Sequence, residues 1–132
     1  QGLEGHRGPV NCCQVYLGET LLVSGSDDGT LKLWDLTTFK EVRTFGGHTN
    51  GVSSCCVFEN DKYLVCGSGN YTLKVWDLST GTVMRTLKGH TSWVTCCAVF
   101  GGDTTVISGS GDHTLKVWDL ATGEELHALK GH

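Results

Sequence analysis

Residues 114–120 read TLKVWDL, and this stretch decides the fold because it recurs along the chain. The same seven letters stand at residues 72–78, and TLKLWDL stands at residues 30–36, each 42 residues from the next. Histidines keep the same interval, at His6, His48, His90 and His132. A fixed period of roughly 20 to 50 residues is the signature of an architecture built from repeated supersecondary units. The chain is therefore predicted to consist of three like units.

The units align as residues 7–48, 49–90 and 91–132 without a gap, and 14 of the 42 columns are identical in all three. This agreement spans whole units, so the repeat concerns the fold and not one local motif. Each unit holds four short segments typical of strands, separated by turn residues, and helical spacing is absent. Six residues, QGLEGH, precede the first unit and supply its opening Gly-His.

The segments differ in how their apolar residues are distributed. The first, as in WVTCCAVF at residues 93–100, is apolar on both faces, which suits an innermost strand covered on both sides. The fourth, EELHALK at residues 124–130, mixes charged and apolar residues, as an outer edge strand does. We expect an all-β fold of three four-stranded antiparallel sheets, and the chain as a single array of such sheets. The expected bounds are residues 9–46, 51–88 and 93–130, with residues 131–132 opening a further unit.

Composition limits the classes of partner. The net charge of -4 and the isoelectric point near 5.8 provide no basic stripe, so neither nucleic acid nor an anionic membrane is an expected partner. No apolar run approaches the roughly 20 residues of a membrane-spanning helix, and the first ten residues lack the apolar region of a signal peptide. We expect a soluble chain.

Six of the seven cysteines stand in adjacent pairs, at residues 12–13, 55–56 and 96–97. Neighbours on a strand point to opposite faces, so the two members of a pair do not bridge each other easily. Free thiols in a reducing, cytoplasmic compartment are the interpretation that we favour.

A period near 40, four strands per unit, and Gly-His and Trp-Asp at fixed offsets resemble the WD40 repeat of β-propellers. The cysteine pairs, GHTN at residues 47–50 and LKLWDL at residues 31–36 are similar to propeller segments of G-protein β subunits and of apoptosome-type sensor ATPases. The resemblance implies a non-catalytic platform without a cofactor. It also implies that a protein or a peptide binds on the rim that carries the Gly-His loops.

The resemblance further implies a buried hydrogen-bonded network in each blade, made by the Gly-His histidine, a strand serine, a turn aspartate and the tryptophan. By position these residues are His6, Ser24, Asp28 and Trp34 in the first unit and His90, Ser108, Asp112 and Trp118 in the third. The second unit keeps His48 and Trp76 but has Cys66 and Asn70 at the other two positions. Because a neutral amide is a weaker acceptor than a carboxylate, we expect the middle blade to be the least rigid at this rim.

A serine, a histidine and an aspartate also invite an enzymatic interpretation. A catalytic site would occur once, whereas this chain repeats the set, each time with a tryptophan that no nucleophilic triad requires. The structural interpretation is therefore favoured. No C-x-x-C spacing occurs and the repeated histidines stand one per unit, so we expect no metal site.

Positions that vary between units are candidates for a partner-binding surface. The residue before the first strand is Pro9, Gly51 and Trp93 in turn, and an exposed tryptophan on a rim is typical of an interaction hot spot. Trp93 is therefore the first candidate. Weaker candidates on the same rim are Arg7, Asn50, Ser92, Tyr71 and His113.

Three blades do not close a ring, because propellers have about four to eight. Two sheet faces would stay open, and apolar faces of this size drive association. Either copies of the chain self-associate, two giving six blades and three giving nine, or blades of a longer parent protein complete the ring. His132, which begins a fourth unit, favours a segment of a longer array. The alternative function is a purely structural self-assembling segment with no ligand of its own.

Overall fold

Each 42-residue unit folds into one antiparallel sheet of four strands. The computed structural model describes residues 5–16, 20–45, 51–58, 62–68, 71–102 and 104–130. Over these residues the chain forms twelve strands and no helix, so this part of the chain contains no helix that could cross a membrane. The predicted all-β class is therefore confirmed.

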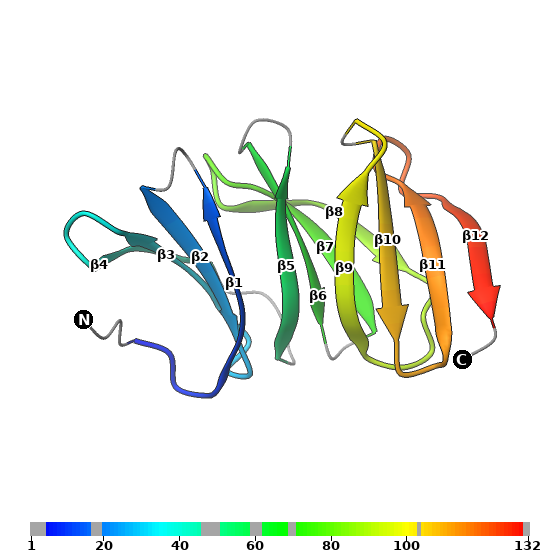
Figure 1. The fold of residues 1–132 in the computed structure, drawn as a ribbon, viewed down its shortest axis with the longest axis horizontal. Coiled ribbons are helices and arrows are strands. Elements are labelled where there is room, and N and C mark those ends of the chain that lie inside the picture. The colour runs from blue at the N-terminus through cyan, green and yellow to red at the C-terminus, as the bar shows by residue number, and fades with distance from the viewer. Residues whose placement is uncertain are drawn as a thin grey trace.

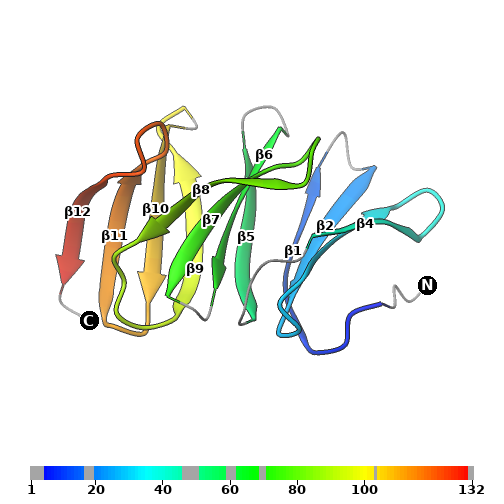
Figure 2. The ribbon, with the colours of Figure 1, turned by 180° about the vertical axis from the view of Figure 1, so that it is seen from behind.

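The strands of each sheet follow one another in chain order (Figures 1 and 2). Blade one consists of β1 (Val10–Tyr16), β2 (Leu21–Ser26), β3 (Leu31–Asp35) and β4 (Lys40–Phe45). Blade two consists of β5 (Val52–Phe58), β6 (Tyr63–Ser68), β7 (Thr72–Asp77) and β8 (Thr82–Lys88). Blade three consists of β9 (Val94–Phe100), β10 (Thr105–Ser110), β11 (Thr114–Asp119) and β12 (Glu125–Lys130).

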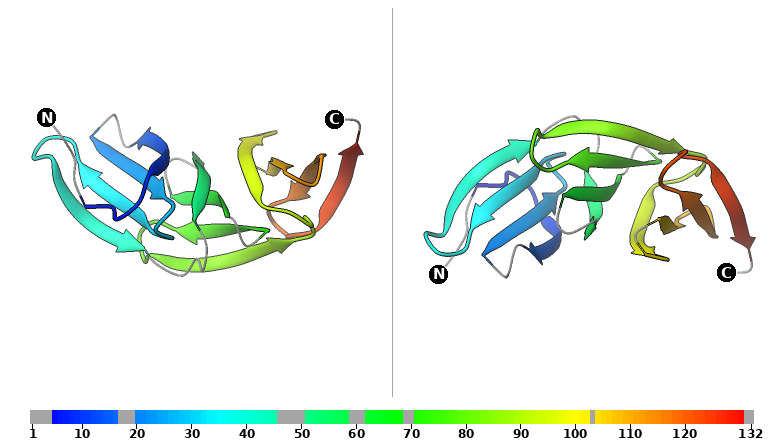
Figure 3. Two further views of the ribbon diagram at one scale, coloured as in Figure 1. Left: turned by 90° about the horizontal axis from the view of Figure 1, so that it is seen from below. Right: turned by 90° about the horizontal axis from the view of Figure 1, so that it is seen from above.

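The three blades fan out along an arc that does not close (Figure 3). The first strands β1, β5 and β9 lie on the concave side, and the last strands β4, β8 and β12 lie on the convex side. Every residue of β12 is exposed, as expected of an outer edge strand. The chain thus has the shape of a propeller sector with one open blade face at each end.

The hydrophobic core lies between blades and not within them. The face that each blade turns toward the next unit, its outgoing face, packs on the incoming face of that unit. In blade one the outgoing face comprises Val23, Leu31, Leu33 and Phe45, and the incoming face of blade two comprises Val52, Leu64, Cys66, Trp76 and Leu78. The ring of Phe45 stacks on that of Trp76 at a centroid distance of 5.6 Å. A second cluster joins blade two to blade three in the same way, and it includes Val65, Leu73, Val75, Leu87, Val94, Val106 and Trp118.

A β-bulge at the start of each first strand turns one side chain out of the ladder. The bulged residues are Asn11 in β1 and Ser53 in β5. Asn11 donates its amide to the carbonyl of Val52 (2.9 Å), and Ser53 donates its hydroxyl to the carbonyl of Val94. Because a bulge re-aims a side chain, the extra residue gives blades one and two each a polar link to the next blade.

Arginines on the outer strands make a second set of links between blades. Arg43 of β4 donates to the carbonyl of Ser79 (3.1 Å), and Arg85 of β8 donates to the carbonyl of Ala121 (2.7 Å). In blade three the positions of Asn11 and Arg43 are taken by Thr95 and His127. In the part of the chain that the structure describes, no further blade lies beyond them.

The two end faces of the array are uncovered. Val10 on the incoming face of blade one is 57% exposed, whereas its counterparts Val52 and Val94 are fully buried. Leu129 on the outgoing face of blade three is 49% exposed, whereas Phe45 is 3% exposed at the same position. The end faces therefore present apolar side chains that the internal interfaces bury.

Candidate functional site

The polar network of blade three joins the four side chains that the family resemblance implied. His90, on the segment before β9, lies with Nε2 2.7 Å from Ser108 Oγ of β10. Its Nδ1 lies 2.9 Å from Asp112 Oδ2, in the turn between β10 and β11. Trp118 of β11 donates its indole N–H to Ser108 Oγ (2.8 Å).

The donors and acceptors of this network fix its protons. The Trp118 indole is only a donor, so Ser108 Oγ accepts from it and gives its own proton to His90 Nε2. His90 then carries its proton on Nδ1 and donates to the carboxylate of Asp112. Each buried donor thereby has an acceptor, which removes the cost of burying unpaired polar groups.

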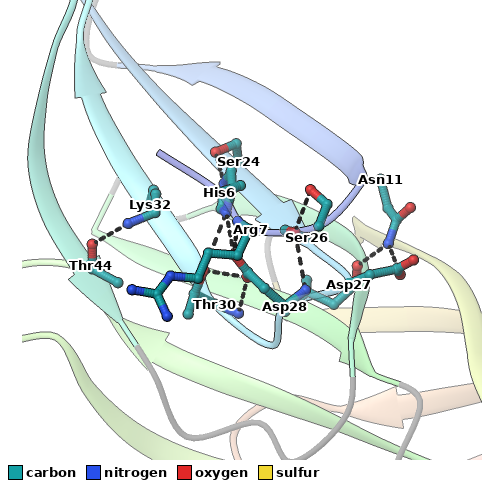
Figure 4. A network of polar contacts seen from close by, with 12 residues as sticks. His6, Arg7, Asn11, Ser24, Ser26, Asp27, Asp28, Thr30, Lys32 and Thr44 are labelled. Carbon is teal, nitrogen blue, oxygen red and sulfur yellow. Dashed lines mark hydrogen bonds and ion pairs between the residues drawn. The ribbon is translucent and has the colours of Figure 1, made fainter. Parts of the chain in front are cut away.

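Blade one repeats the arrangement (Figure 4). His6 Nε2 lies 2.7 Å from Ser24 Oγ, and Nδ1 lies 3.3 Å from Asp28 Oδ2. Trp34 donates to Ser24 Oγ (2.9 Å). The backbone N–H of Arg7 donates to Asp28 Oδ2 (2.8 Å), so the carboxylate also holds the chain that enters the blade.

Each network has a fifth member, a threonine, that the sequence pattern did not predict. Thr30 Oγ1 donates to Asp28 Oδ1 (2.6 Å), and Thr114 Oγ1 donates to Asp112 Oδ1 (2.5 Å). The backbone N–H groups of the same two threonines also donate to these carboxylates. The signal was present in the sequence, because the threonine of TLK is identical in all three units.

Both turn carboxylates have a lowered pKa in the folded chain. Burial opposes ionisation of Asp28, but hydrogen bonds from Thr30, from the Arg7 amide and from His6 outweigh it and hold the pKa well below its ordinary value. In Asp112 the opposing effect of burial is likewise outweighed, by hydrogen bonds from Thr114, His90 and Thr91, and the pKa is lowered. Both carboxylates are therefore charged at neutral pH.

The middle blade has different chemistry at this position. Trp76 donates its indole N–H to Cys66 Sγ (3.2 Å), and burial raises the pKa of the Cys66 thiol. Sulfur is a weaker acceptor than a hydroxyl oxygen, so this bond contributes less than its counterparts in blades one and three. His48 and Asn70 lie outside the described residues.

The geometry of the serine, histidine and aspartate sets serves structure. Ser24 and Ser108 are 4% and 1% exposed, and each hydroxyl oxygen already accepts an indole N–H. A nucleophile needs open access to a substrate carbonyl. Among the described residues no group of three His, Cys, Asp or Glu side chains is arranged to hold a metal ion.

Trp93 stands on the rim at the entrance of β9, and its side chain is 56% exposed. Its backbone is held firmly, because its carbonyl accepts from the Gly111 N–H (3.0 Å) and lies 3.0 Å from Ser110 Oγ. A Cβ on Gly111 would lie 3.2 Å from Trp93 Nε1, so the indole rests against the β10–β11 turn. The carbonyl of Ser92 also accepts from Ser110 Oγ (3.1 Å).

The other rim candidates divide into two groups. Tyr71 and His113 are exposed and have positive φ, at 74° and 72°, in the column where blade one has Gly29. Non-glycine residues rarely adopt this strained conformation. The side chain of Arg7 is exposed, although its amide holds Asp28. Asn50 lies outside the described residues.

A groove of about 410 Å³ opens beside the β10–β11 turn. Its lining includes His113, Lys116 and Lys130. Lys116 Nζ is paired with Glu125 Oε1 at 2.9 Å. The groove and the exposed indole both border the β10–β11 turn, and we term this part of blade three the Trp93 rim.

Comparison with known proteins agrees with this geometry. The sequence profile of WD40, described as WD domain, G-beta repeat, matches residues 1–35, 39–77 and 81–119. Ribosome biogenesis protein BOP1 of Homo sapiens is 52% identical over 40 residues, 30% of this chain and 5% of that protein. U5 small nuclear ribonucleoprotein 40 kDa protein of Mus musculus is 48% identical over 44 residues, 33% of this chain and 12% of that protein. Guanine nucleotide-binding protein subunit beta-like protein of Encephalitozoon cuniculi is 46% identical over 41 residues, 30% of this chain and 12% of that protein.

Solved structures share the fold over almost the whole chain. The crystal structure of RRP9 WD40 repeats superposes with a TM-score of 0.92 at 24% identity, covering 98% of this chain and 41% of that chain. The structure of U3-55K gives a TM-score of 0.92 at 24% identity, with 98% and 42% covered. The chain thus spans less than half the length of these structures and a small part of its sequence relatives. With the profile matched over all three units, the chain belongs to the WD40 family of β-propeller proteins.

Proposed function

We propose that this chain is a non-catalytic platform that binds a protein or a peptide at the Trp93 rim. The observation that carries the proposal is an indole 56% exposed on a backbone held by hydrogen bonds to the β10–β11 turn. Large aromatic side chains on rigid backbone dominate binding energy at protein interfaces. The strained backbone of Tyr71 and His113 supports the same role, because such strain clusters at binding sites.

The net charge of -4 supports a protein partner over a nucleic acid. The names of two relatives mention ribosome biogenesis and a small nuclear ribonucleoprotein, which supports a docking role inside a larger assembly. None of the seven cysteines, all of which lie in the described residues, forms a disulfide, which supports a reducing, cytoplasmic setting.

Replacing Trp93 with alanine is expected to weaken binding of a protein partner by about ten- to a hundredfold, because the anchoring side chain is lost. The melting temperature should change little, since the indole packs mainly against the surface of one turn. Partners are identified by affinity purification with quantitative mass spectrometry. Their dissociation constants for the two proteins are then measured by calorimetry.

Phe100 offers a matched control for this variant. It is 50% exposed at the other end of the same strand, β9, and so lies on the opposite rim. Phe100→Ala should leave the affinity unchanged. Wild-type affinity of every identified partner for Trp93→Ala, or an equal loss with Phe100→Ala, would contradict the proposal.

The open faces support a second part of the proposal, that copies of the chain associate head to tail. The outgoing face of blade three carries Ile107, Leu115 and Val117, which are half-buried, whereas Val23, Leu31 and Leu33 in the same places are buried. The incoming face of blade one offers Val10 as the counterpart of Val52 and Val94. Packing one face on the other would repeat an interface that the chain already makes twice. Such packing gives six blades from two copies or nine from three.

Two exposed cysteines provide a direct test of this packing. Between blades two and three, Ser54 Oγ lies 3.3 Å from Cys97 Sγ. The residues at these two positions on the open faces are Cys96 and Cys13, and both are exposed. Head-to-tail packing therefore brings Cys96 of one copy against Cys13 of the next.

Mild oxidation of the associated protein is expected to join copies through a Cys96–Cys13 disulfide, seen as multiples of 14.2 kDa on a non-reducing gel. Cys96→Ser and Cys13→Ser should each abolish the product, whereas Cys56→Ser should not. A product that survives either of the first two substitutions would contradict head-to-tail packing. In that case blades of a longer parent protein become the better candidate for covering the open faces.

A purely structural, self-assembling segment is the second candidate function. The exposure of Leu129 and Val10 favours it, because these side chains need a covering blade whether or not the rim binds a ligand. Association through Cys96 and Cys13 together with unchanged binding by Trp93→Ala would select this function over the platform.

A further inference from the structure

Two neighbouring positions in the first strand of each blade carry small side chains. At each interface between blades, the first position of one blade faces the second position of the next. Cys12, Ser54 and Cys96 share one position in β1, β5 and β9, and each side chain lies over the glycine of the next strand, at Gly25, Gly67 and Gly109. A Cβ on Gly25 would lie 2.7 Å from Cys12 Sγ and 2.5 Å from Cγ1 of Val52 in blade two. Cys12 therefore sits at the boundary between blades one and two.

The second position, one residue later, reaches back toward the preceding blade. Cys97 of blade three shows this directly, because its Sγ lies 3.3 Å from Ser54 Oγ of blade two. At the first interface the same two positions are Cys12 and Cys55, and each thiol shifts the pKa of the other. Both cysteines also pack against the same hydrophobic cluster. By the repeat, Cys12 and Cys55 therefore face each other between β1 and β5 as Ser54 and Cys97 do between β5 and β9.

We propose that Cys12 and Cys55 form a redox-active pair that closes into a disulfide between blades one and two when a hydroperoxide oxidises Cys12. The thiolate of Cys12 attacks one oxygen of hydrogen peroxide, the O–O bond breaks, and Cys12 becomes a sulfenic acid while hydroxide leaves. The sulfur of Cys55 then attacks the sulfur of Cys12, the S–O bond breaks, and the proton of Cys55 leaves with the departing hydroxide as water. Two thiols and one hydrogen peroxide give one disulfide and two waters.

The two cysteines are suited to different steps. The hydrogen bond with Cys55 lowers the pKa of Cys12 against the opposing effect of burial, and a backbone contact with Gly25 acts in the same direction. The same hydrogen bond and burial raise the pKa of Cys55. The thiolate is the reactive form, so Cys12 is the attacking residue and Cys55 the resolving residue.

The interface between blades two and three provides a comparison, because it lacks one of the two cysteines. Ser54 replaces the attacking cysteine, and burial raises the pKa of Cys97 to about 12, against hydrogen bonding with Ser54. No disulfide is possible there without a second sulfur. Of the two interfaces within the chain, only the first can therefore form this disulfide, and its formation is independent of any partner at the Trp93 rim.

The test uses the 132-residue chain with Cys13→Ser and Cys96→Ser, which removes the exposed thiols of the open faces. After treatment with hydrogen peroxide we expect a mass loss of about 2 Da, for two hydrogen atoms, and a peptide that joins Cys12 to Cys55. The melting temperature should rise by roughly 10 °C, because the bond closes a long loop, and dithiothreitol should reverse the rise.

Two further variants of the same protein test the role of Cys55 and the arrangement of the two positions. Cys55→Ser should leave Cys12 as a sulfenic acid that dimedone traps, with no mass loss. Ser54→Cys should create a second bond, to Cys97, if the two positions face each other as described. A sulfenic acid on Cys12 that persists while Cys55 is present, or a disulfide from Cys55 to another cysteine, would overturn the proposal.

Discussion

Replacing Trp118 with alanine is expected to lower the free energy of unfolding by about 3–5 kcal/mol, the usual cost of emptying a large aromatic site in a core. Trp118 is 1% exposed and packs in the cluster that joins blades two and three. The substitution also leaves the acceptor oxygen of Ser108 without the indole N–H. Urea denaturation followed by circular dichroism measures the change.

Two other substitutions separate the contribution of aromatic packing from that of the indole hydrogen bond, and that of a buried indole from that of an exposed one. Trp118→Phe keeps an aromatic ring but loses the N–H, so it should cost about 1–3 kcal/mol, clearly less than the alanine variant. Trp93→Ala removes an indole that is 56% exposed and should stay within about 0.5 kcal/mol of the wild type. Equal costs for Trp118→Ala and Trp93→Ala would mean that the core does not lie between the blades.

Replacing Asp112 with asparagine should lower the free energy of unfolding by about 1–3 kcal/mol at neutral pH. Oδ1 accepts from the hydroxyl and the amide of Thr114, and Oδ2 accepts from His90 Nδ1 and the amide of Thr91. An asparagine replaces one of these oxygens with an NH₂ group, which is a donor. The two groups that donate to that oxygen in the wild type would then lose their acceptor. Asp119→Asn, in the surface turn where the carboxylate accepts the Ala121 amide, should cost less.

The same variant tests the electrostatics of the network. The folded state lowers the pKa of Asp112, so its stabilising effect is complete above the unfolded pKa of roughly 3.9 and is lost as pH falls below that value. The stability difference between the wild type and Asp112→Asn should therefore shrink between about pH 5 and pH 3. A difference that stays constant, or grows, over this range would show that Asp112 is not held as a charged acceptor.

The repeat made most of the fold predictable. Fourteen identical columns and four alternating segments per unit are enough to predict three four-stranded sheets, because periodicity reports which side chains face a neighbour. The association of His90, Ser108, Asp112 and Trp118 followed from family resemblance, since no local pattern brings residues so far apart together. The role of Thr114 was not predicted because the alternating pattern of residues 114–120 was already accounted for by a strand.

The hydrogen bonds and cysteine pairing between blades could not be predicted from the sequence. Asn11 and Ser53 act through β-bulges, and an extra residue in a strand has no signature in an alternating pattern. The placing of Cys12 opposite Cys55 depends on how two inner strands face each other across an interface, which intervals of 42 residues do not specify. The sequence pairs cysteines that are neighbours in one strand, whereas Cys12 and Cys55, which face each other, belong to different blades.

We propose that the open blade faces of separate copies bind each other. Sedimentation equilibrium from about 1 to 100 µM protein measures it most directly, because mass action shifts an associating chain toward its complex. We expect the mass to rise from 14.2 kDa toward two or three times that value, and Leu129→Glu on the outgoing face of blade three to prevent the rise. A folded chain that stays at 14.2 kDa over the whole range would contradict the claim.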